Sequence, residues 1–488
     1  MRQATLVAVL TRPPTAAGDE ISALPETVRL LEVRADRAGD LDPDWLRGRF
    51  RGELLYSLRS RAEGGAFAGG EAERRARLLR AAQSGFELVD LESERDLAPP
   101  LLAALPPHRR VVSWHGPAAG LDALTERWQR MGSVAARLFR IVTEAGEPAD
   151  ALAPLQLLRR AARPDLAAYA SGHAGWWSRM LAPRLGAPWV FTAARAEDAE
   201  PGEPTLARLT ADFGLPALPP VEQLYGIVGG SAGRSMSPRL HNAAYRELGL
   251  PALYLPFPTT GFSAFCAQLG NGALGELGWP LSGLTVTSPH KEAALAWAGR
   301  ASPLARRAGA ANTLLRRDGA WQADTADAHG VLAALASRGV EVAGRKVAVV
   351  GCGGAGRSAA AGLKACGALV TLVNRGLERG HYAARLLALP FVPLAELAPG
   401  DFTLVVHATP LVEDAPFAVD RLAAGAVVVD LVYGRAPTPL VAAAAQRGTA
   451  IDGWEILVIE ARRQFEMMAG RTMPEPLARR LVRESAQP

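Results

Sequence analysis

Lysine is the residue that this sequence most lacks. Of its 54 lysines and arginines only three are lysines, Lys291, Lys346 and Lys364, and residues 1–290 contain none. Any reaction that needs an amine therefore has few candidates, all in the second half of the chain. The arginines are spread along the chain, the net charge is only +5, and no basic stripe is interleaved with aromatic residues, so we expect no nucleic-acid partner.

Cysteines and long apolar runs are also scarce. Three scattered cysteines, Cys266, Cys352 and Cys366, are too few for a disulfide framework or a zinc site, which implies no metal and a reducing compartment. No apolar run approaches the length of a membrane span, and the N-terminal ATLVAVL favours a first β-strand over a signal peptide. We therefore expect a cytoplasmic protein without a membrane partner, and a length of 488 residues suggests about three domains.

A glycine motif in the second half organises the rest of the chain. Gly351, Gly353 and Gly356 have the G-x-G-x-x-G spacing, with Gly354 and Ala355 between them. The motif separates the apolar run VAVV from an Ala-rich helical pattern, and a second strand, LVTLV, follows. Such glycines let the backbone turn sharply and approach a pyrophosphate, whose charge then lies at a helix N-terminus. The pattern predicts a Rossmann-type dinucleotide-binding lobe.

The end of that second strand indicates which dinucleotide is bound. An adenosine ribose with a free 2′-hydroxyl calls for Asp or Glu, but this chain has Asn374 and Arg375, with Arg379 four residues on. Guanidinium groups suit a 2′-phosphate, so NADP is the predicted cofactor. The alternative is that these arginines form a solvated charged rim.

Residues 1–215 repeat a short apolar segment about every two dozen residues, separated by helical patterns. We count eight such segments, at 4–10, 28–34, 53–59, 86–92, 110–115, 136–142, 165–171 and 187–193. Eight strand-helix units of this length predict a (β/α)8 barrel, whose site lies at the carboxyl ends of the strands. Unlike polar groups gather there, which favours an anionic ligand over a buried ion-pair lattice: Glu32, Arg34, Arg59, Asp90, Glu92, His115 and Arg140.

The segments LEVRAD, RSRAEGG, VDLE, SWH and SGHAGWWSR resemble type I 3-dehydroquinate dehydratase over about residues 1–215. The resemblance implies that His115 moves a proton, that Glu92 is its carboxylate partner, and that Arg59 and Arg179 bind substrate. It also implies a lysine that forms a Schiff base, but Arg140 stands at that position. A guanidinium does not lose its proton to attack a ketone. The loop that reads Ala-Pro-Gly-Gln in the family is changed to residues 200–203, EPGE.

We therefore predict that the barrel has no Schiff-base dehydratase activity. Three alternatives stay open: a ligand-binding relic, a structural, regulatory or ligand-sensing partner for the second half, and a different chemistry based on His115. A barrel that dehydrates without a Schiff base would make the chain fully bifunctional.

After a Pro-rich linker at 216–222, a second set of motifs begins with a Gly/Ser loop that holds Ser235 and Ser237. Such a loop can bind an anion or a polyol, or can simply cap a helix. SGLTVTSPHKEAAL, AGAANTLL and QADTADAHG follow, then VVHATPL, VVVDLVYGRAPTPL and DGWEILVIEARRQF. In this order they resemble shikimate dehydrogenase from about residue 223 to 475. The resemblance implies NADPH-dependent reduction of 3-dehydroshikimate to shikimate, the step after dehydroquinate dehydration.

Lys291 and Asp327 are the predicted catalytic pair. Reduction of a ketone needs a hydride donor and a group that passes a proton to the oxygen, and an ammonium oriented by a carboxylate can do the second. The alternative is a surface salt bridge, but this chain uses arginine for almost every other cation. By resemblance, Thr409 lies under the cofactor, and the substrate is bound by Ser235, Ser237, Thr287, Asn312, Tyr433 and Glu460.

Three departures from the family pattern put the substrate in question. Thr285 replaces an asparagine, Thr325-Ala326 replaces Asn-Thr, and Glu460 replaces a glutamine. An ionised carboxylate accepts hydrogen bonds but cannot donate them, so quinate or an analogue stays an alternative to shikimate.

The predicted domains are a barrel at 1–215, a substrate lobe at 223–328, a Rossmann lobe at 329–452 and a helical segment at 453–488 that returns to the substrate lobe. The sequence leaves the oligomeric state open, with a homodimer through the barrel as one option.

Overall fold

The computed structural model describes residues 3–15, 18–200, 203–434 and 436–486. The chain forms two compact units, which are described one at a time: Met1–Glu222 with Pro256–Pro280, and Gln223–Leu255 with Leu281–Pro488. Among the described residues, no helix has both the length and the apolar character needed to cross a membrane.

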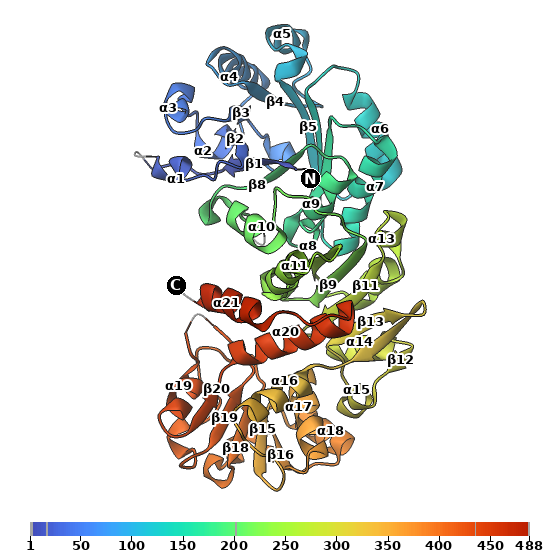
Figure 1. The fold of residues 1–488 in the computed structure, drawn as a ribbon. Coiled ribbons are helices and arrows are strands. Elements are labelled where there is room, and N and C mark those ends of the chain that lie inside the picture. The colour runs from blue at the N-terminus through green and yellow to red at the C-terminus, as the bar shows by residue number, and fades with distance from the viewer. Residues whose placement is uncertain (1–2, 16–17, 201–202, 435, 487–488) are drawn as a thin grey trace. The chain divides into compact units, whose positions relative to one another are not determined.

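The first unit is built on one eight-stranded sheet that wraps into a nearly closed barrel, ordered β7-β6-β5-β4-β3-β2-β1-β8 (Figure 1). All of its strand pairs are parallel. The strands match the eight predicted segments, because each is a short apolar run that is buried on both faces. They are β1 (Thr5–Leu10), β2 (Val28–Arg34), β3 (Glu53–Ser57), β4 (Leu88–Glu92), β5 (Arg110–Pro117), β6 (Leu138–Glu144), β7 (Leu166–Ser171) and β8 (Trp189–Ala193).

Helices connect these strands on the outside of the barrel. The four longest are α4 (Glu71–Gln83), α6 (Leu121–Met131), α7 (Leu152–Ala161) and α10 (Leu206–Phe213). Shorter ones are α1 (Asp19–Ser22), α2 (Ala35–Ala38), α3 (Pro43–Arg47), α5 (Pro99–Ala104), α8 (Gly172–Gly175) and α9 (Ser178–Leu181). Residues 256–280 add α12 (Phe262–Phe265) and α13 (Ala273–Glu276).

The second unit contains two six-stranded sheets. The first has the order β10-β9-β11-β13-β14-β12, with β9 and β11 parallel and β13 antiparallel to both β11 and β14. Its strands are β9 (Gln223–Gly229), β10 (Ala252–Pro258), β11 (Leu281–Val286), β12 (Arg300–Ala301), β13 (Thr313–Arg317) and β14 (Ala320–Asp324). Its helices are α11 (Ser237–Glu247), α14 (Lys291–Trp297) and α15 (Pro303–Ala308).

The other sheet is wholly parallel, with the order β17-β16-β15-β18-β19-β20. This is the doubly wound order of dinucleotide-binding folds, which place the ligand where the order reverses, here between β15 and β18. The strands are β15 (Lys346–Val350), β16 (Leu369–Asn374), β17 (Phe391–Pro393), β18 (Leu404–His407), β19 (Val427–Asp430) and β20 (Thr449–Ile451). The helices are α16 (Asp327–Ser337), α17 (Gly354–Ala365), α18 (Leu377–Leu387) and α19 (Pro439–Ala445).

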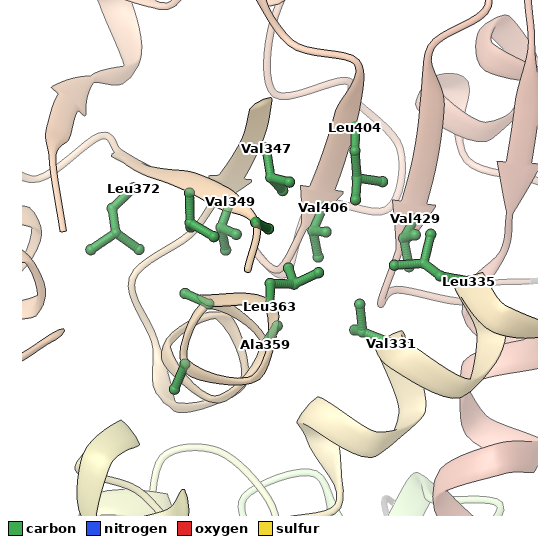
Figure 2. Packing of buried hydrophobic residues seen from close by; sticks show 14 of the residues in the cluster. Val331, Leu335, Val347, Val349, Ala359, Leu363, Leu372, Leu404, Val406 and Val429 are labelled. Atoms are coloured by element: carbon green, nitrogen blue, oxygen red, sulfur yellow. The ribbon is translucent and has the colours of Figure 1, made fainter. Parts of the chain in front are cut away.

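Two hydrophobic clusters pack against this parallel sheet, a smaller one that includes Val350 and Val428 and a larger one that includes α16 and α17. Val347 and Val349 of β15 and Val406 of β18 meet Ala359 and Leu363 of α17 (Figure 2). Val331 and Leu335 extend the same cluster along α16, the helix that begins at Asp327. Two final helices, α20 (Gly453–Ala469) and α21 (Glu475–Ala486), close the unit, with α20 against α16 and against strands β11 and β13 of the first sheet.

Candidate active sites

The carboxyl ends of the barrel strands hold Arg140 in a buried ion pair. Arg140 of β6 donates from Nη1 to the two oxygens of Glu32 on β2, at 2.9 and 3.1 Å, and from Nε to the Tyr169 hydroxyl at 3.1 Å. Glu32 is fully buried. Burial would raise the pKa of Glu32, but Arg140 and the neighbouring arginines outweigh it and hold the pKa below its ordinary value. Arg140 is therefore the counter-ion of a buried carboxylate.

His115, at the end of β5, has a different partner from the expected one. Its backbone N–H donates to Glu63 Oε2 at 2.8 Å, its Nδ1 lies 3.4 Å from the same oxygen, and Arg59 contacts Nδ1 as well. Glu92 instead accepts hydrogen bonds from the Ser60 backbone N–H and hydroxyl, both at 2.7 Å. The expected pairing of Glu92 with His115 is therefore wrong, because these two donors hold the Glu92 carboxylate on the β3 side.

Every arginine expected in the barrel site has a carboxylate partner. The ion pairs are Arg34–Asp36 at 2.9 Å, Arg59–Asp90 at 2.8 Å, Arg140–Glu32 at 2.9 Å, and Arg179–Glu203. Burial and then Arg59 lower the pKa of His115 well below its ordinary value, so its imidazole is neutral at neutral pH. Burial and the charge of Glu92 raise the pKa of Glu63 to about 8.

The sequence interpretation missed Glu63 and Tyr169 as members of this site. Glu63 lies in a short 3₁₀ turn, η1 (Arg61–Glu63), and only its place in RSRAEGG marked it. Tyr169 is flanked by alanines on β7, a pattern typical of an ordinary buried strand. Of the altered loop at 200–203, positions 201 and 202 lie outside the described residues, while Glu203 supplies the carboxylate for Arg179.

In the second unit, the structure brings Lys291 and Asp327 together. They are the first residues of α14 and α16, and Lys291 Nζ donates to both Asp327 oxygens, at 2.7 and 2.9 Å. Asn312 Nδ2 donates to Asp327 Oδ1 at 2.9 Å, and Thr325 Oγ1 lies 3.4 Å from Oδ2. Because an ammonium has three donors and Asp327 takes two, one N–H of Lys291 stays available for a substrate oxygen.

Hydroxyl groups gather between the first sheet and α20. Ser235 Oγ lies 3.1 Å from Ser237 Oγ, the Tyr254 hydroxyl donates to Thr285 Oγ1 at 2.6 Å, and Thr285 Oγ1 donates to Gln464 Oε1 at 3.0 Å. The half-buried Thr287 follows β11 directly. Thr285, noted in the sequence only as a replacement, is thus part of a hydrogen-bonded chain.

Gln464 of α20 was not predicted from the sequence. Its Nε2 donates to the Asn312 backbone carbonyl at 3.2 Å and to Thr313 Oγ1 at 3.1 Å, which ties α20 to β13. The signal that marks it is its spacing: it lies four residues after Glu460, on the same face of the helix.

Glu460 and Tyr433 lie near the catalytic pair. A side chain at Gly330, one turn after Asp327 on α16, would place its Cβ 2.7 Å from Glu460 Cγ. Burial, and then the charge of Asp327, raise the pKa of Glu460 to about 8, against the opposing effect of Lys291. Burial and Glu460 also raise the pKa of Tyr433, whose ring lies 4.5 Å from that of Trp454.

The glycine loop has the backbone geometry that its sequence predicts. Gly351 has φ of 113°, in the region that favours glycine, and a Cβ there would lie 2.7 Å from the Ala408 carbonyl. A Cβ at Gly356 would lie 1.9 Å from the Gly351 carbonyl oxygen. Gly353 precedes the first residue of α17, and no atom lies within 4 Å of the place for its Cβ. The protein therefore packs tightly against Gly351 and Gly356 and leaves the space beside Gly353 open.

Asn374 and the two arginines follow the end of β16. Asn374 Oδ1 accepts from the Cys352 backbone N–H at 3.1 Å, so this side chain stabilises the glycine turn itself. Arg375 is exposed, and Arg379 of α18 pairs with Glu292 at 3.2 Å. Glu292 follows Lys291 directly and also accepts from the buried Arg357 at 2.8 Å.

Thr409 lies beside the glycine turn, with its Cγ2 3.1 Å from the place for a Gly351 Cβ. Its hydroxyl contacts His407 Nε2, and His407 Nδ1 lies 2.9 Å from Asp430 Oδ1. Because Asp430 is an acceptor, the His407 proton belongs on Nδ1, and Nε2 then accepts from Thr409. His407 and Asp430 were missed, since both lie at the ends of buried strands.

Two family models match the chain. Type I 3-dehydroquinase matches residues 6–214, and the shikimate dehydrogenase substrate binding domain matches residues 227–314.

Similar proteins cover the same two parts. A chloroplastic bifunctional 3-dehydroquinate dehydratase/shikimate dehydrogenase of Arabidopsis thaliana is 29% identical over 487 residues, with 92% of this chain and 79% of the relative covered. A shikimate dehydrogenase (NADP(+)) of Halobacterium salinarum is 37% identical over 267 residues, which cover 53% of this chain and 98% of the relative. A crystal structure of a shikimate dehydrogenase in complex with NADP+ has a TM-score of 0.50 at 23% identity, and covers 55% of this chain and 96% of the other.

Proposed function

The chain belongs to the shikimate dehydrogenase family, with a type I 3-dehydroquinase domain ahead of that part, and from this premise we propose that it reduces 3-dehydroshikimate to shikimate with NADPH. The observation that carries the proposal is the Lys291–Asp327 pair. It is the only lysine-carboxylate ion pair among the described residues, in a chain with three lysines.

Lys291 has the role of proton donor. One N–H of the ammonium can donate a charge-assisted hydrogen bond to the ketone oxygen, and Asp327 holds the ammonium in place. Asn312 fixes Asp327, and is itself fixed by the Ala326 backbone N–H, which donates to its Oδ1 at 2.8 Å. As the ketone becomes an alcohol, the proton moves from Lys291 Nζ to the substrate oxygen.

NADP fits the glycine loop. The unobstructed space above Gly353, at the start of the 12-residue α17, suits a pyrophosphate, and the exposed Arg375 and Arg379 suit a 2′-phosphate. When bound, the nicotinamide supplies the hydride. Thr409, held by His407, lies beside the turn on which the cofactor would lie.

Shikimate and the nucleotide are the proposed partners, in the cytoplasm. The three cysteines are free thiols, which suits a reducing compartment. The homodimer through the barrel stays a proposal to be tested by light scattering.

For the barrel, we propose that Schiff-base dehydration is absent. Arg140 cannot act as an amine nucleophile. Its positive charge, which an anionic ligand would need, is already neutralised by Glu32. A second candidate, lysine-independent dehydration, is favoured by the neutral His115 beside Glu63, since an unprotonated imidazole can accept a proton and a protonated carboxyl can give one.

Reduction of NADP+ by shikimate tests the dehydrogenase proposal. We expect the purified chain to reduce NADP+ with shikimate, with NAD+ and quinate as poorer alternatives. Turnover with quinate but not shikimate would overturn the substrate assignment. For the barrel, the absence of a borohydride-trapped adduct with 3-dehydroquinate is expected, and a trapped adduct would contradict the account.

A further inference from the structure

Glu292, the residue after Lys291 on α14, is shared by two arginines of the Rossmann lobe. Its Oε1 accepts from Nη2 of Arg357 on α17 at 2.8 Å and from Nη2 of Arg379 on α18 at 3.2 Å. Burial opposes the ionisation of Glu292, but the hydrogen bonds and charges of the two arginines outweigh it and lower the pKa of the carboxyl below its ordinary value. Glu292 is therefore a carboxylate at neutral pH.

The two arginines differ in how freely they can move. Arg357 is fully buried, and its guanidinium also donates to the backbone carbonyls of Ala308, Gly309 and Cys352. A buried guanidinium needs its counter-ion, so Arg357 holds the carboxylate in place. The side chain of Arg379 is 59% exposed, and the carboxylate is its one partner among the described residues. Arg379 is therefore the arginine that can leave.

Arg379 is also one of the two cations expected to hold the 2′-phosphate of NADP. The other, Arg375, is exposed and pairs with no carboxylate in the part of the chain that the structure describes. One arginine of the site is thus ready for a phosphate, and the other is already engaged. A 2′-phosphate can take Arg379 only by replacing Glu292, whereas the 2′-hydroxyl of NADH carries no charge that calls for this exchange.

We propose that Glu292 competes with the 2′-phosphate for Arg379 and so limits how strongly the site prefers NADPH over NADH. The inference rests on the proposed dehydrogenase function and adds to it a positioning residue that acts through Arg379. When NADPH binds, Arg379 turns from the carboxylate to the phosphate, and Glu292 stays with Arg357. Because exposed ion pairs contribute little, the competition weakens NADPH binding by only about two- to fivefold.

The test measures the dissociation constants of NADPH and NADH for the full-length protein and for Glu292→Gln. Glutamine keeps an acceptor for Arg357 and removes the charge that holds Arg379. We expect the NADH constant divided by the NADPH constant to rise about two- to fivefold, because only NADPH has to break the ion pair. A loss that acts through Arg357 and the glycine turn weakens both nucleotides and cancels in this ratio. An unchanged or lower ratio would overturn the inference.

Two controls separate competition from other effects of charge. In an Arg379→Ala background, Glu292→Gln should leave the ratio unchanged, since the contested cation is gone. An equal rise in both backgrounds would mean that Glu292 repels the phosphate directly, which would overturn the inference. Glu341→Gln removes an exposed carboxyl five residues before β15, at the end of the sheet opposite the nucleotide, and should change neither constant.

A second readout needs only the adenosine half of the cofactor. 2′,5′-ADP and AMP differ by the same 2′-phosphate, so in Glu292→Gln the AMP constant divided by the 2′,5′-ADP constant should rise as well. If Glu292→Gln does not fold, Glu292→Asp keeps a charge for the buried Arg357, and its shorter side chain should release the exposed Arg379 with the same result.

The binding constants also separate this inference from the proposed reaction. If wild type binds NADPH without turnover of 3-dehydroshikimate, the proposed reaction fails, and the ratios still test Glu292. Binding of neither nucleotide would overturn both the proposed function and the competition at Arg379.

Discussion

The N-termini of two helices set the positions of Lys291 and Asp327. Each is the first residue of its helix, so the direction of α14 and α16 decides where the ammonium and the carboxylate meet. Asn312 and Thr325 then hold the carboxylate from the side of the first sheet. The pair needs both helices, although the two residues are 36 positions apart.

Loss of the ammonium should remove most dehydrogenase activity. We expect Lys291→Ala to lower kcat by about 10²- to 10⁴-fold, because the variant lacks the ammonium that Asp327 orients for proton transfer to the ketone. Lys346→Ala, an exposed lysine at the start of β15, is the control. A drop of the same size in both variants would show that the loss is structural.

Glu63 gives the barrel a pH-dependent stability. In the folded protein its pKa is about 8, above the ordinary value of 4.5, so the folded state binds this proton more tightly than the unfolded state. Wild type should therefore lose stability as the pH rises from 4.5 to 8, by up to about 5 kcal/mol, and Glu63→Gln should not. Urea unfolding at pH 5 and pH 8 measures the difference. Glu94→Gln, at an exposed position, serves as control. An equal change in unfolding free energy between pH 5 and pH 8 for all three proteins would contradict the raised pKa of Glu63.

At the scale of elements, two glycines of the loop are needed for different reasons. Gly356 is needed for packing, and Gly353 for nucleotide binding. Gly356→Ala would place a methyl group 1.9 Å from the Gly351 carbonyl oxygen, so α17 must shift. Gly353→Ala meets no protein atom within 4 Å.

We therefore expect Gly356→Ala to lower both the unfolding temperature and nucleotide binding. Gly353→Ala should keep the unfolding temperature and raise the KM for NADPH, because its methyl group lies where the pyrophosphate passes. Differential scanning fluorimetry and NADPH titration separate the two outcomes. Unchanged NADPH binding in Gly353→Ala would place the nucleotide elsewhere.

The Arg140–Glu32 pair is an element of barrel packing. Arg140→Met leaves the fully buried Glu32 without its cation and should cost roughly 3–5 kcal/mol. The double variant Glu32→Gln with Arg140→Met removes both charges and should recover most of that loss. Urea unfolding of the three proteins checks the prediction, and equal losses in the single and double variants would mean that Arg140 acts through packing alone.

The strands could be predicted because apolar runs of regular spacing leave few other folds. Val347 to Val350 and the glycines after them predict both a strand and a dinucleotide-binding turn. The partners of the site residues could not be predicted in the same way. Glu63 reaches His115 from a three-residue turn, and Gln464 reaches Asn312 from a helix 152 positions away, so neither contact leaves a local pattern.

At the scale of the whole molecule, the chain joins two units that carry different functional groups. The second unit has the lysine, the carboxylate and the glycine loop that a dehydrogenase needs. The first has a barrel whose arginines are paired with carboxylates of its own. If both halves worked, their covalent link would raise the local concentration of the shared intermediate.

The central claim is a working dehydrogenase joined to a barrel without Schiff-base chemistry. The most direct test follows NADPH absorbance when 3-dehydroshikimate, and separately 3-dehydroquinate, is added to the full-length protein. The account predicts NADPH oxidation with the first and none with the second. Oxidation with both, with shikimate rather than quinate as the product formed from 3-dehydroquinate, would show that the barrel dehydrates without a lysine. Oxidation with neither would contradict the proposed function of the second unit.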